Sequence, residues 1–371
     1  MASSINSGSS APTILINLFI NKIVLIKMAD VSNPVKPLLQ VLNGQQLDRP
    51  PLWLMRQAGR YLPEYRALRS QKGGFLELVN DPQNAAEVTL QPIRRFGFDG
   101  AILFSDILII PHALGQDLWF AEGEGPRLAP KLVDHDLETL RRAPERLTTI
   151  YETVRRVSGS LAPTTTLLGF AGSPWTVATY MIAGQGSKEQ AEARRYAYRD
   201  PKRFAAIIDA IADLTVIYLR GQIDAGADAV QLFDSWSGSL SPAQFEQWVI
   251  APTARIVASI RATHPATPII GFPKGAGGKL IAYAEQTGVS AIGIDETVDP
   301  LWAARSLPAG LPVQGNLDPL ALIAGGQTLF DAAARILAAF ADRPHVFNLG
   351  HGILPDTPIA HVEALIKQVR G

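Results

Sequence analysis

Short apolar runs alternate with longer amphipathic stretches along the chain after residue 28. An apolar run bounded by turn residues predicts a buried strand, whereas apolar positions that recur every three or four residues predict a helix. The runs predict about eight strands, many of them ending in glycine or a polar residue. They lie at 51–55, 101–106, 165–172, 229–235, 268–273, 291–296, 312–318 and 345–351.

The amphipathic stretches between these runs predict helices, with clear examples at 84–95, 137–157 and 201–224. A hydrogen-bond acceptor followed by proline is a typical signal for a helix N-terminus. The chain repeats that signal at Asp81-Pro82, Asp200-Pro201, Ser241-Pro242, Asp318-Pro319 and Thr357-Pro358.

Strands that alternate with helices predict a (β/α)8 barrel, whose chemistry lies at the carboxyl ends of the strands. A doubly wound open sheet gives a similar alternation and stays an alternative. The chain has no Gly-x-Gly-x-x-Gly turn after its first strand, which weakens the nucleotide-binding version of that sheet. No linker-like segment divides 28–371, so we expect a single catalytic barrel domain there.

Residues 1–27 have a different character. The first twelve positions are rich in serine and small residues, which is typical of disorder. The apolar stretch 13–27 is too short to span a membrane and is interrupted by polar residues. We expect 1–27 to be a disordered extension outside the fold, with a membrane anchor as the alternative.

Composition narrows the possible functions. The 371 residues contain 34 Lys plus Arg and 34 Asp plus Glu, and this balance argues against a nucleic-acid-binding surface. The chain has no cysteine, which excludes disulfides, thiolate nucleophiles and Cys-ligated zinc or iron–sulfur sites. A cysteine-free chain is consistent with a cytoplasmic location.

Four arginines follow the first predicted strand closely: Arg56, Arg60, Arg66 and Arg69. Guanidinium groups bind carboxylates and phosphates through paired hydrogen bonds, so the cluster predicts an anion-binding mouth. A solvated basic loop is the alternative. We expect Pro63 to delay the start of the next helix.

Other polar residues stand at or just after the ends of the remaining predicted strands, where a barrel brings them together. They are Asp106, Tyr180, Asp234, Ser235, Lys274, Asp295, Asn316, Asp318 and His351.

Several of these candidates have a structural alternative. Asp106 is either a helix cap or a functional anion, and Tyr180 is either a core aromatic or a site residue. Ser235 has no Gly-x-Ser-x-Gly elbow, so a ligand role is favoured over a nucleophile. Lys274 lies in a glycine-rich turn and could form a Schiff base or contact phosphate. His351 stands between two glycines, which favours a functional role, and no histidine pair has the spacing of zinc ligands.

Seven segments together resemble the uroporphyrinogen decarboxylase family. They are LMRQAGRYLPEYR at 54–66, FSDIL at 104–108, FAEGEGPR at 120–127, GFAGSPWTVATYM at 169–181, QLFDSW at 231–236, GNLDP at 315–319 and FNLGHGI at 347–353. The first is the most specific, and all seven occur in order, whereas residues 1–27 match nothing in the family.

The resemblance implies a homodimeric (β/α)8 barrel without metal or organic cofactor. Its substrate would be uroporphyrinogen III, whose four acetate arms lose CO2 to give coproporphyrinogen III. The resemblance implies that Asp106 contacts the pyrrole N–H groups. It also implies that Arg56, Arg60 and Arg69 bind the substrate carboxylates. Arg56 is also a candidate proton donor. Tyr180, Ser235 and His351 would line the cleft and contact substrate.

Three competing functions remain open at this point. A corrinoid-dependent methyltransferase would use a zinc site built from His and Cys, and the chain has no Cys. A non-catalytic tetrapyrrole-binding protein would keep the arginines without needing Asp106. An aldolase would use Lys274 as its Schiff-base lysine.

Overall fold

The computed structural model describes residues 1–2, 4, 35–121, 125–187 and 189–371. Within them, Lys36–Gly371 forms one compact unit. None of the helices in the described residues is long and apolar enough to cross a membrane. The expected extension at 1–27 falls almost entirely outside the described residues and stays a prediction.

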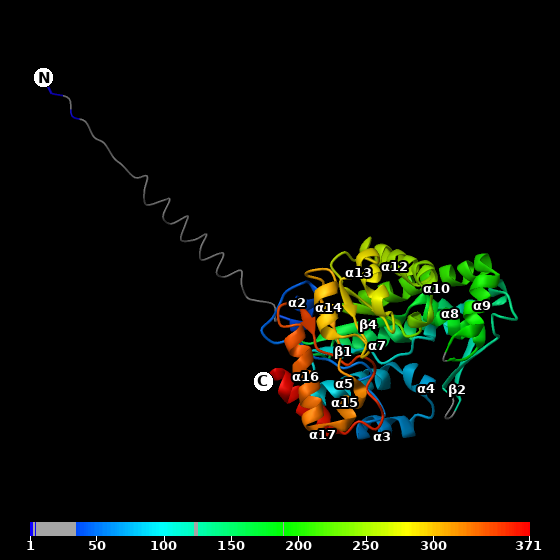
Figure 1. The fold of residues 1–371 in the computed structure, drawn as a ribbon, viewed down its shortest axis with the longest axis horizontal. Helices are drawn as coiled ribbons and strands as arrows, with labels where there is room; N and C mark the ends of the chain where they lie inside the picture. Colours follow the sequence, from blue (N-terminus) through cyan, green and yellow to red (C-terminus); the bar gives the residue numbers. More distant parts are fainter. Residues whose placement is uncertain (3, 5–34, 122–124, 188) are drawn as a thin grey trace. The chain divides into compact units, whose positions relative to one another are not determined.

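A curled sheet of seven parallel strands forms the centre of this unit, and helices surround it (Figure 1). Each strand pairs with the next one along the chain, in the order β1-β4-β5-β6-β7-β8-β9. The strands are β1 Gly100–Ile102, β4 Thr166–Gly172, β5 Ala229–Asp234, β6 Ile269–Pro273, β7 Ala291–Gly293, β8 Val313–Gln314 and β9 His345–Val346. β1 and the last three strands are shorter than predicted, because the rest of each run continues as a loop beyond the strand.

The predicted first strand occupies the eighth place, between β9 and β1. Leu52 forms a parallel bridge with Phe347, whose N–H donates to the Pro51 carbonyl at 2.9 Å. On the other side, the Asp99 N–H donates to the Leu52 carbonyl at 2.9 Å. The segment 51–55 is thus extended but has few ladder hydrogen bonds, and we call it the first stave of the barrel. It completes the predicted (β/α)8 barrel.

The helices are bounded as follows: α2 Pro37–Leu42, α3 Pro63–Gln71, α4 Phe75–Val79, α5 Pro82–Phe96, α6 Ile109–Leu114, α7 Thr148–Ser158, α8 Pro174–Ala183, α9 Ala191–Arg199, α10 Pro201–Asp224, α11 Pro242–Phe245, α12 Ala251–Arg261, α13 Leu280–Gln286, α14 Pro300–Ser306, α15 Pro319–Ala324, α16 Gly326–Ala339 and α17 Ile359–Arg370. An antiparallel hairpin, β2 Asp117–Ala121 and β3 Gly125–Ala129, stands apart from the main sheet.

Most of the acceptor-proline signals mark real helix starts. The carboxylates of Asp81, Asp200 and Asp318 each accept a backbone N–H from the first turn of the helix that follows. The signal at Thr357 is displaced, because α17 begins only after Pro358 and has no side-chain cap. The expectation for Pro63 is wrong: α3 begins at this proline, which is well tolerated at the first helical position.

The helix expected at 137–157 is only half helical. Two 3-10 turns, Leu137–Thr139 and Pro144–Leu147, precede α7. Pro144 accounts for the break, because a proline disfavours helical geometry in the residue before it. Ala143 accordingly has φ −140° and ψ 65°.

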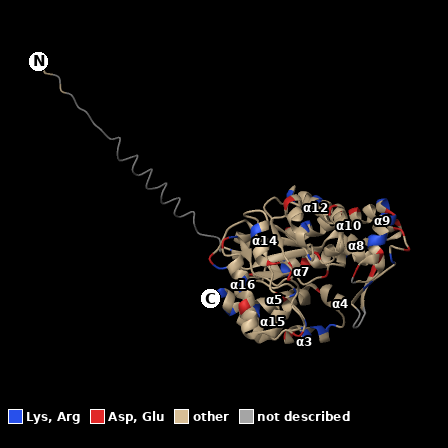
Figure 2. Ribbon diagram, viewed as in Figure 1, with Lys and Arg blue, Asp and Glu red and all other residues tan. Residues whose placement is uncertain are grey.

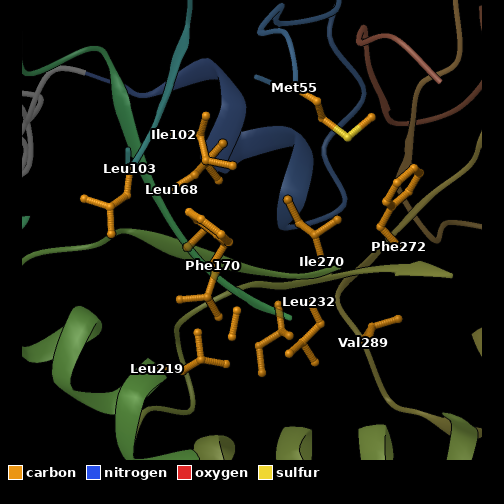
Figure 3. Packing of buried hydrophobic residues seen from close by; sticks show 14 of the residues in the cluster. Met55, Ile102, Leu103, Leu168, Phe170, Leu219, Leu232, Ile270, Phe272 and Val289 are labelled. Carbon is orange, nitrogen blue, oxygen red and sulfur yellow. The ribbon is translucent and has the colours of Figure 1, made fainter. Parts of the chain in front are cut away.

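The barrel interior is apolar around a short polar chain. Phe170, Gln231 and Ile270 stand beside one another in register across three strands, and Figure 3 shows Phe170, Ile270 and Met55 among the packed core side chains. The Trp53 indole N–H donates to Gln314, and the Gln314 amide donates to Gln231, both at 3.0 Å. These bonds satisfy buried polar atoms and tie the first stave to β8 and β5.

Candidate active site

Arg56 stands at the turn where the first stave leaves the barrel. Its φ is 60°, a left-handed conformation that is uncommon outside glycine. The preceding Met55 is fixed on both sides, because its N–H donates to Asn348 Oδ1 at 2.9 Å and its carbonyl accepts from the Ile353 N–H at 2.8 Å. The loop after β9 therefore fixes the backbone of the residue that precedes Arg56, and a rigid surrounding of this kind allows an uncommon conformation to persist.

Steric crowding explains why glycine stands on both sides of His351. A Cβ at Gly352 would lie 2.3 Å from Arg56 Cδ, so the arginine side chain runs directly over this glycine. A Cβ at Gly350 would lie 2.1 Å from the backbone nitrogen of Glu296. The Gly-His-Gly turn thus brings His351 and Arg56 close to each other at the same rim.

Asp106 follows β1 and is half-buried. Its Oδ1 accepts the Leu108 N–H at 2.7 Å, which closes a tight turn just before α6. Burial raises the pKa of Asp106, while the Leu108 N–H and the positive charge of Arg56 oppose that rise. Asp106 therefore lies within electrostatic reach of Arg56, and it is not the N-cap of α6, which is Leu108.

Two helix-borne hydroxyls hold the strand end that carries Asp106. The Phe104 N–H donates to Thr89 Oγ1 at 3.1 Å, and Ser105 Oγ lies 3.3 Å from the Tyr218 hydroxyl. Thr89 and Tyr218 are fully buried on α5 and α10. Neither was among the residues expected from the sequence.

Tyr180 reaches the same region from α8. Its ring centroid lies 6.5 Å from that of Trp236, directly after β5. Burial raises the pKa of Tyr180 and the charge of Asp106 adds to the rise, whereas the Trp236 indole and Arg56 oppose it. Ser235, next to Trp236, is half-buried, and its hydroxyl makes no hydrogen bond to any other described residue.

His351 is electrically neutral in this setting. Burial, together with the charges of Arg56 and Lys274, lowers the pKa of His351 to about 3, and the charge of Asp295 opposes this shift. These influences link His351 to Arg56, and Arg56 in turn to Asp106 and Tyr180. Four of the predicted site residues therefore meet at one end of the barrel.

The remaining arginines differ in whether their side chains are hydrogen-bonded within the described chain. Figure 2 shows basic residues in blue along α3. The Arg66 guanidinium donates to the Arg60 carbonyl at 2.6 Å, so it supports its own loop. Arg60 is exposed and its side chain forms no hydrogen bond or ion pair within the described chain. The Arg69 guanidinium donates to the Tyr65 hydroxyl at 3.1 Å and lies 5.8 Å from the centroid of the Phe75 ring.

Three other strand-end candidates serve the scaffold. Asp295 is buried, and its carboxylate accepts the backbone N–H groups of two neighbouring loop residues. Asn316 donates to the Asp295 and Val298 carbonyls, each at 2.8 Å. Asp318 caps α15. At the strand ends, these three residues therefore stabilise the loops and the helix start around the site.

Lys274 forms an ion pair with Glu296, with Nζ 3.3 Å from Oε1. The Glu296 carboxylate therefore engages the amino group that the aldolase alternative would use. In the described parts of the chain, no group of three or more His, Cys, Asp or Glu residues has a geometry that could hold a metal ion.

A (β/α)8 barrel with arginines, a desolvated acid beside one of them and a neutral histidine at the carboxyl ends of its strands belongs to the class of barrel enzymes that act on anionic small molecules. The uroporphyrinogen decarboxylase family model matches residues 33–371, and the chain belongs to that family.

Curated relatives support this membership. The uroporphyrinogen decarboxylase of Sphingopyxis alaskensis is 74% identical over 336 residues, which cover 91% of this chain and 98% of the relative. That of Rhizorhabdus wittichii is 69% identical over 344 residues, covering 93% of this chain and 100% of the relative.

Solved structures share the fold at low identity. A methyltransferase from Methanosarcina mazei superposes with a TM-score of 0.74 at 18% identity, over 90% of this chain and 97% of that chain. A B12-independent methionine synthase from Shewanella sp. W3-18-1 gives 0.53 at 10% identity, over 80% of this chain and 87% of that chain. These likenesses speak for the fold alone.

Proposed function

We propose that this protein is a uroporphyrinogen decarboxylase, which removes CO2 from the four acetate arms of uroporphyrinogen III and releases coproporphyrinogen III. Family membership over residues 33–371 supports the reaction. The observation that carries the proposal within the site is the pairing of a desolvated acid, Asp106, with the arginine Arg56 at one rim.

The reaction needs an electron sink, and the macrocycle supplies it. Protonating a pyrrole ring gives a cation that accepts the electron pair released when the bond between the acetate methylene and its carboxylate breaks. CO2 then leaves, a proton delivered to the methylene carbon completes the methyl group, and the ring gives up the proton it had gained. One proton is therefore consumed for each CO2 released. A fixed carboxylate beside the ring N–H stabilises the cation, and this is the role proposed for Asp106.

The raised pKa of Asp106 fits this role. In the free enzyme, burial destabilises the ionised carboxylate, and Arg56 provides only partial relief. A pyrrolic cation beside Asp106 would compensate that cost. Stabilisation is then greatest when positive charge develops, which is what transition-state binding requires.

The arginines divide the work on the substrate carboxylates. Arg60 is exposed and without a protein partner in the described chain, so it is free to bind an acidic arm. The hydrogen bond to Tyr65 and the contact with the Phe75 ring hold the Arg69 guanidinium in one orientation. We assign both to the arms that are not reacting, and Arg56, nearest Asp106, to the scissile acetate and to proton delivery.

The neutral groups complete the cleft. His351 stays uncharged at neutral pH, so it acts as a hydrogen-bond partner and not as a cation. The Tyr180 hydroxyl, which lies beside the Trp236 indole, and the Ser235 hydroxyl would contact substrate in the same way. The resemblance further implies a cytoplasmic homodimer that binds neither nucleic acid nor membrane. For such a dimer, light scattering should give about twice the chain mass of 40.0 kDa.

The test is anaerobic incubation of the enzyme with freshly reduced uroporphyrin, followed by chromatography that counts the carboxylates left on the product. The proposal expects products with seven to four carboxylates, and the last should accumulate. Dialysis against EDTA should leave the rate unchanged, since no metal step is proposed. A product that keeps all eight carboxylates would overturn the proposal.

A further inference from the structure

Asp234 is a buried acid that the proposed reaction does not use. It ends β5 beside Pro273 of β6, and it is 1% exposed. A carboxyl group in such a place is costly unless it is hydrogen-bonded. We therefore ask which hydrogen bonds of Asp234 compensate for its burial.

One oxygen of Asp234 has a strong partner and the other has none. Oδ1 accepts the Thr176 hydroxyl at 2.5 Å, while Oδ2 is buried and makes no hydrogen bond to any described residue. Burial raises the pKa of Asp234 to about 7, and the contact with Thr176 limits the rise. Tyr283, on α13, is close enough for the charge of Asp234 to raise its pKa as well.

The Thr176 hydroxyl links Asp234 to the backbone of Trp236. Because its single proton goes to Asp234, its lone pairs are left to accept, and the Trp236 N–H donates to Thr176 Oγ1 at 3.1 Å. The Trp175 indole N–H donates to the Trp236 carbonyl at 3.1 Å. The first turn of α8 therefore fixes both backbone polar groups of Trp236.

The fixed segment belongs to the cleft. Ser235 precedes Trp236 in the chain, and the Trp236 ring lies beside Tyr180, which α8 also carries. One helix thus sets the position of Tyr180 directly, and of Ser235 and Trp236 through Thr176. Asp234 is buried and supports this arrangement through its hydrogen bond with Thr176.

We propose that Asp234 and Thr176 are positioning residues: the Asp234 carboxyl orients the Thr176 hydroxyl, which anchors the Trp236 backbone and so holds Ser235 and Trp236 in place to bind the macrocycle. The inference deepens the proposed function and uses its substrate for one of two readouts.

Thr176→Val and Thr176→Ser form the matched pair for the test. Valine has nearly the same shape without the hydroxyl, whereas serine keeps it. We expect Thr176→Val to raise KM for uroporphyrinogen about tenfold, the equivalent of one lost hydrogen bond, with kcat within about threefold. Thr176→Ser should keep the KM of the unmodified enzyme. A lowered melting temperature with unchanged KM would mean a purely structural role and would overturn the inference.

Asp234→Asn and Asp234→Ala test the other end. The asparagine carbonyl still accepts from Thr176, so Asp234→Asn should keep the normal KM, whereas Asp234→Ala should match Thr176→Val. If both substitutions raise KM equally, orientation by the Oδ1 contact is wrong.

Hydrogen exchange supplies a readout that needs no substrate. In Thr176→Val, the Trp236 amide should exchange at least about tenfold faster than in Thr176→Ser, while β4 stays protected. Equal exchange in the two variants overturns the anchoring role even if the enzyme is active. Faster exchange in an enzyme that makes no coproporphyrinogen would uphold the anchoring and refute only the proposed function.

Discussion

At the scale of single residues, burial and neighbouring charge set the chemistry of each side chain more than its type does. Asp106 and Asp234 are both acids at strand ends, and burial raises the pKa of both. Only Asp106 lies beside an arginine of the cleft, so only Asp106 is assigned to the reacting ring. Asp234 turns its bonded oxygen toward a helix.

The role of Asp106 predicts a loss of turnover without loss of binding. Asp106→Asn keeps the size and the turn-forming oxygen but cannot carry the negative charge that stabilises the pyrrolic cation. We expect kcat to fall by about 10²-fold or more. Binding of the reduced substrate, followed by equilibrium dialysis under anaerobic conditions, should change little. Normal kcat in this variant would refute the role.

The two kinds of arginine give a matched comparison. Arg60→Ala should raise KM about tenfold or more, because a charge-assisted hydrogen bond to a substrate arm is lost. Arg66→Ala, in which the lost bonds are to its own loop, should change KM much less. Steady-state kinetics and melting curves of both variants check this, and equal effects on KM would contradict the assignment.

The buried carboxyl of Asp234 predicts a dependence of stability on pH. Its pKa rises from 3.8 to about 7 on folding, so between those values the folded state binds more protons than the unfolded chain. The free energy of unfolding should therefore fall as pH rises through this window, by up to about 4 kcal/mol. Urea titrations from pH 4 to 7 should show a shallower fall in Asp234→Asn, and parallel curves would contradict the prediction.

Sequence reasoning at this scale found the residues that end strands and missed those that support them from helices. Arg56, Asp106 and His351 could be predicted to lie together because a barrel brings strand ends together, and Tyr180 because α8 starts directly after β4. Thr89, Thr176 and Tyr218 could not, because a hydroxyl inside an amphipathic helix has no pattern that distinguishes a buried support from an ordinary core position.

At the scale of elements, the first stave of the barrel positions Arg56, the arginine assigned to the reacting arm. The first stave makes few ladder hydrogen bonds and depends on the loop after β9 to hold Met55 beside Arg56. Periodicity predicted a buried strand at 51–55, and the structure has a buried extended segment there with one isolated bridge at Leu52. Its dependence on Asn348 could not be predicted, because that contact joins residues 293 positions apart.

Asn348→Ala tests that dependence. Asn348 Oδ1 accepts the N–H groups of Met55 and Leu349, so the substitution leaves two buried donors without a partner. We expect a loss of about 2 kcal/mol or more in the free energy of unfolding, together with reduced activity. Asn43→Ala, whose side chain bonds on the exposed surface, is the control. Unchanged stability in Asn348→Ala would show that Arg56 is held by other means.

At the scale of the whole molecule, alternation of strands and helices predicted the barrel because each unit must bury one face against the same centre. Boundaries were less predictable. Local proline geometry split the stretch 137–157 and started α3 at Pro63, against expectation. These are effects of one residue on its neighbours, which hydrophobic periodicity does not register.

The extension gives a prediction for the full chain. The family match begins at residue 33, so deletion of residues 1–27 should leave kcat and KM within about twofold of the full-length enzyme. Comparison of the two purified proteins checks this. Loss of soluble, active protein on truncation would show that the extension belongs to the working enzyme.

The most direct test of the site as a decarboxylation centre is to count CO2 released from uroporphyrinogen III labelled in its acetate carboxyls. We expect four equivalents of labelled CO2 per macrocycle from the unmodified enzyme, and almost none from Asp106→Asn over the same time. Release at equal rates from both proteins would show that Asp106 does not stabilise the reacting ring.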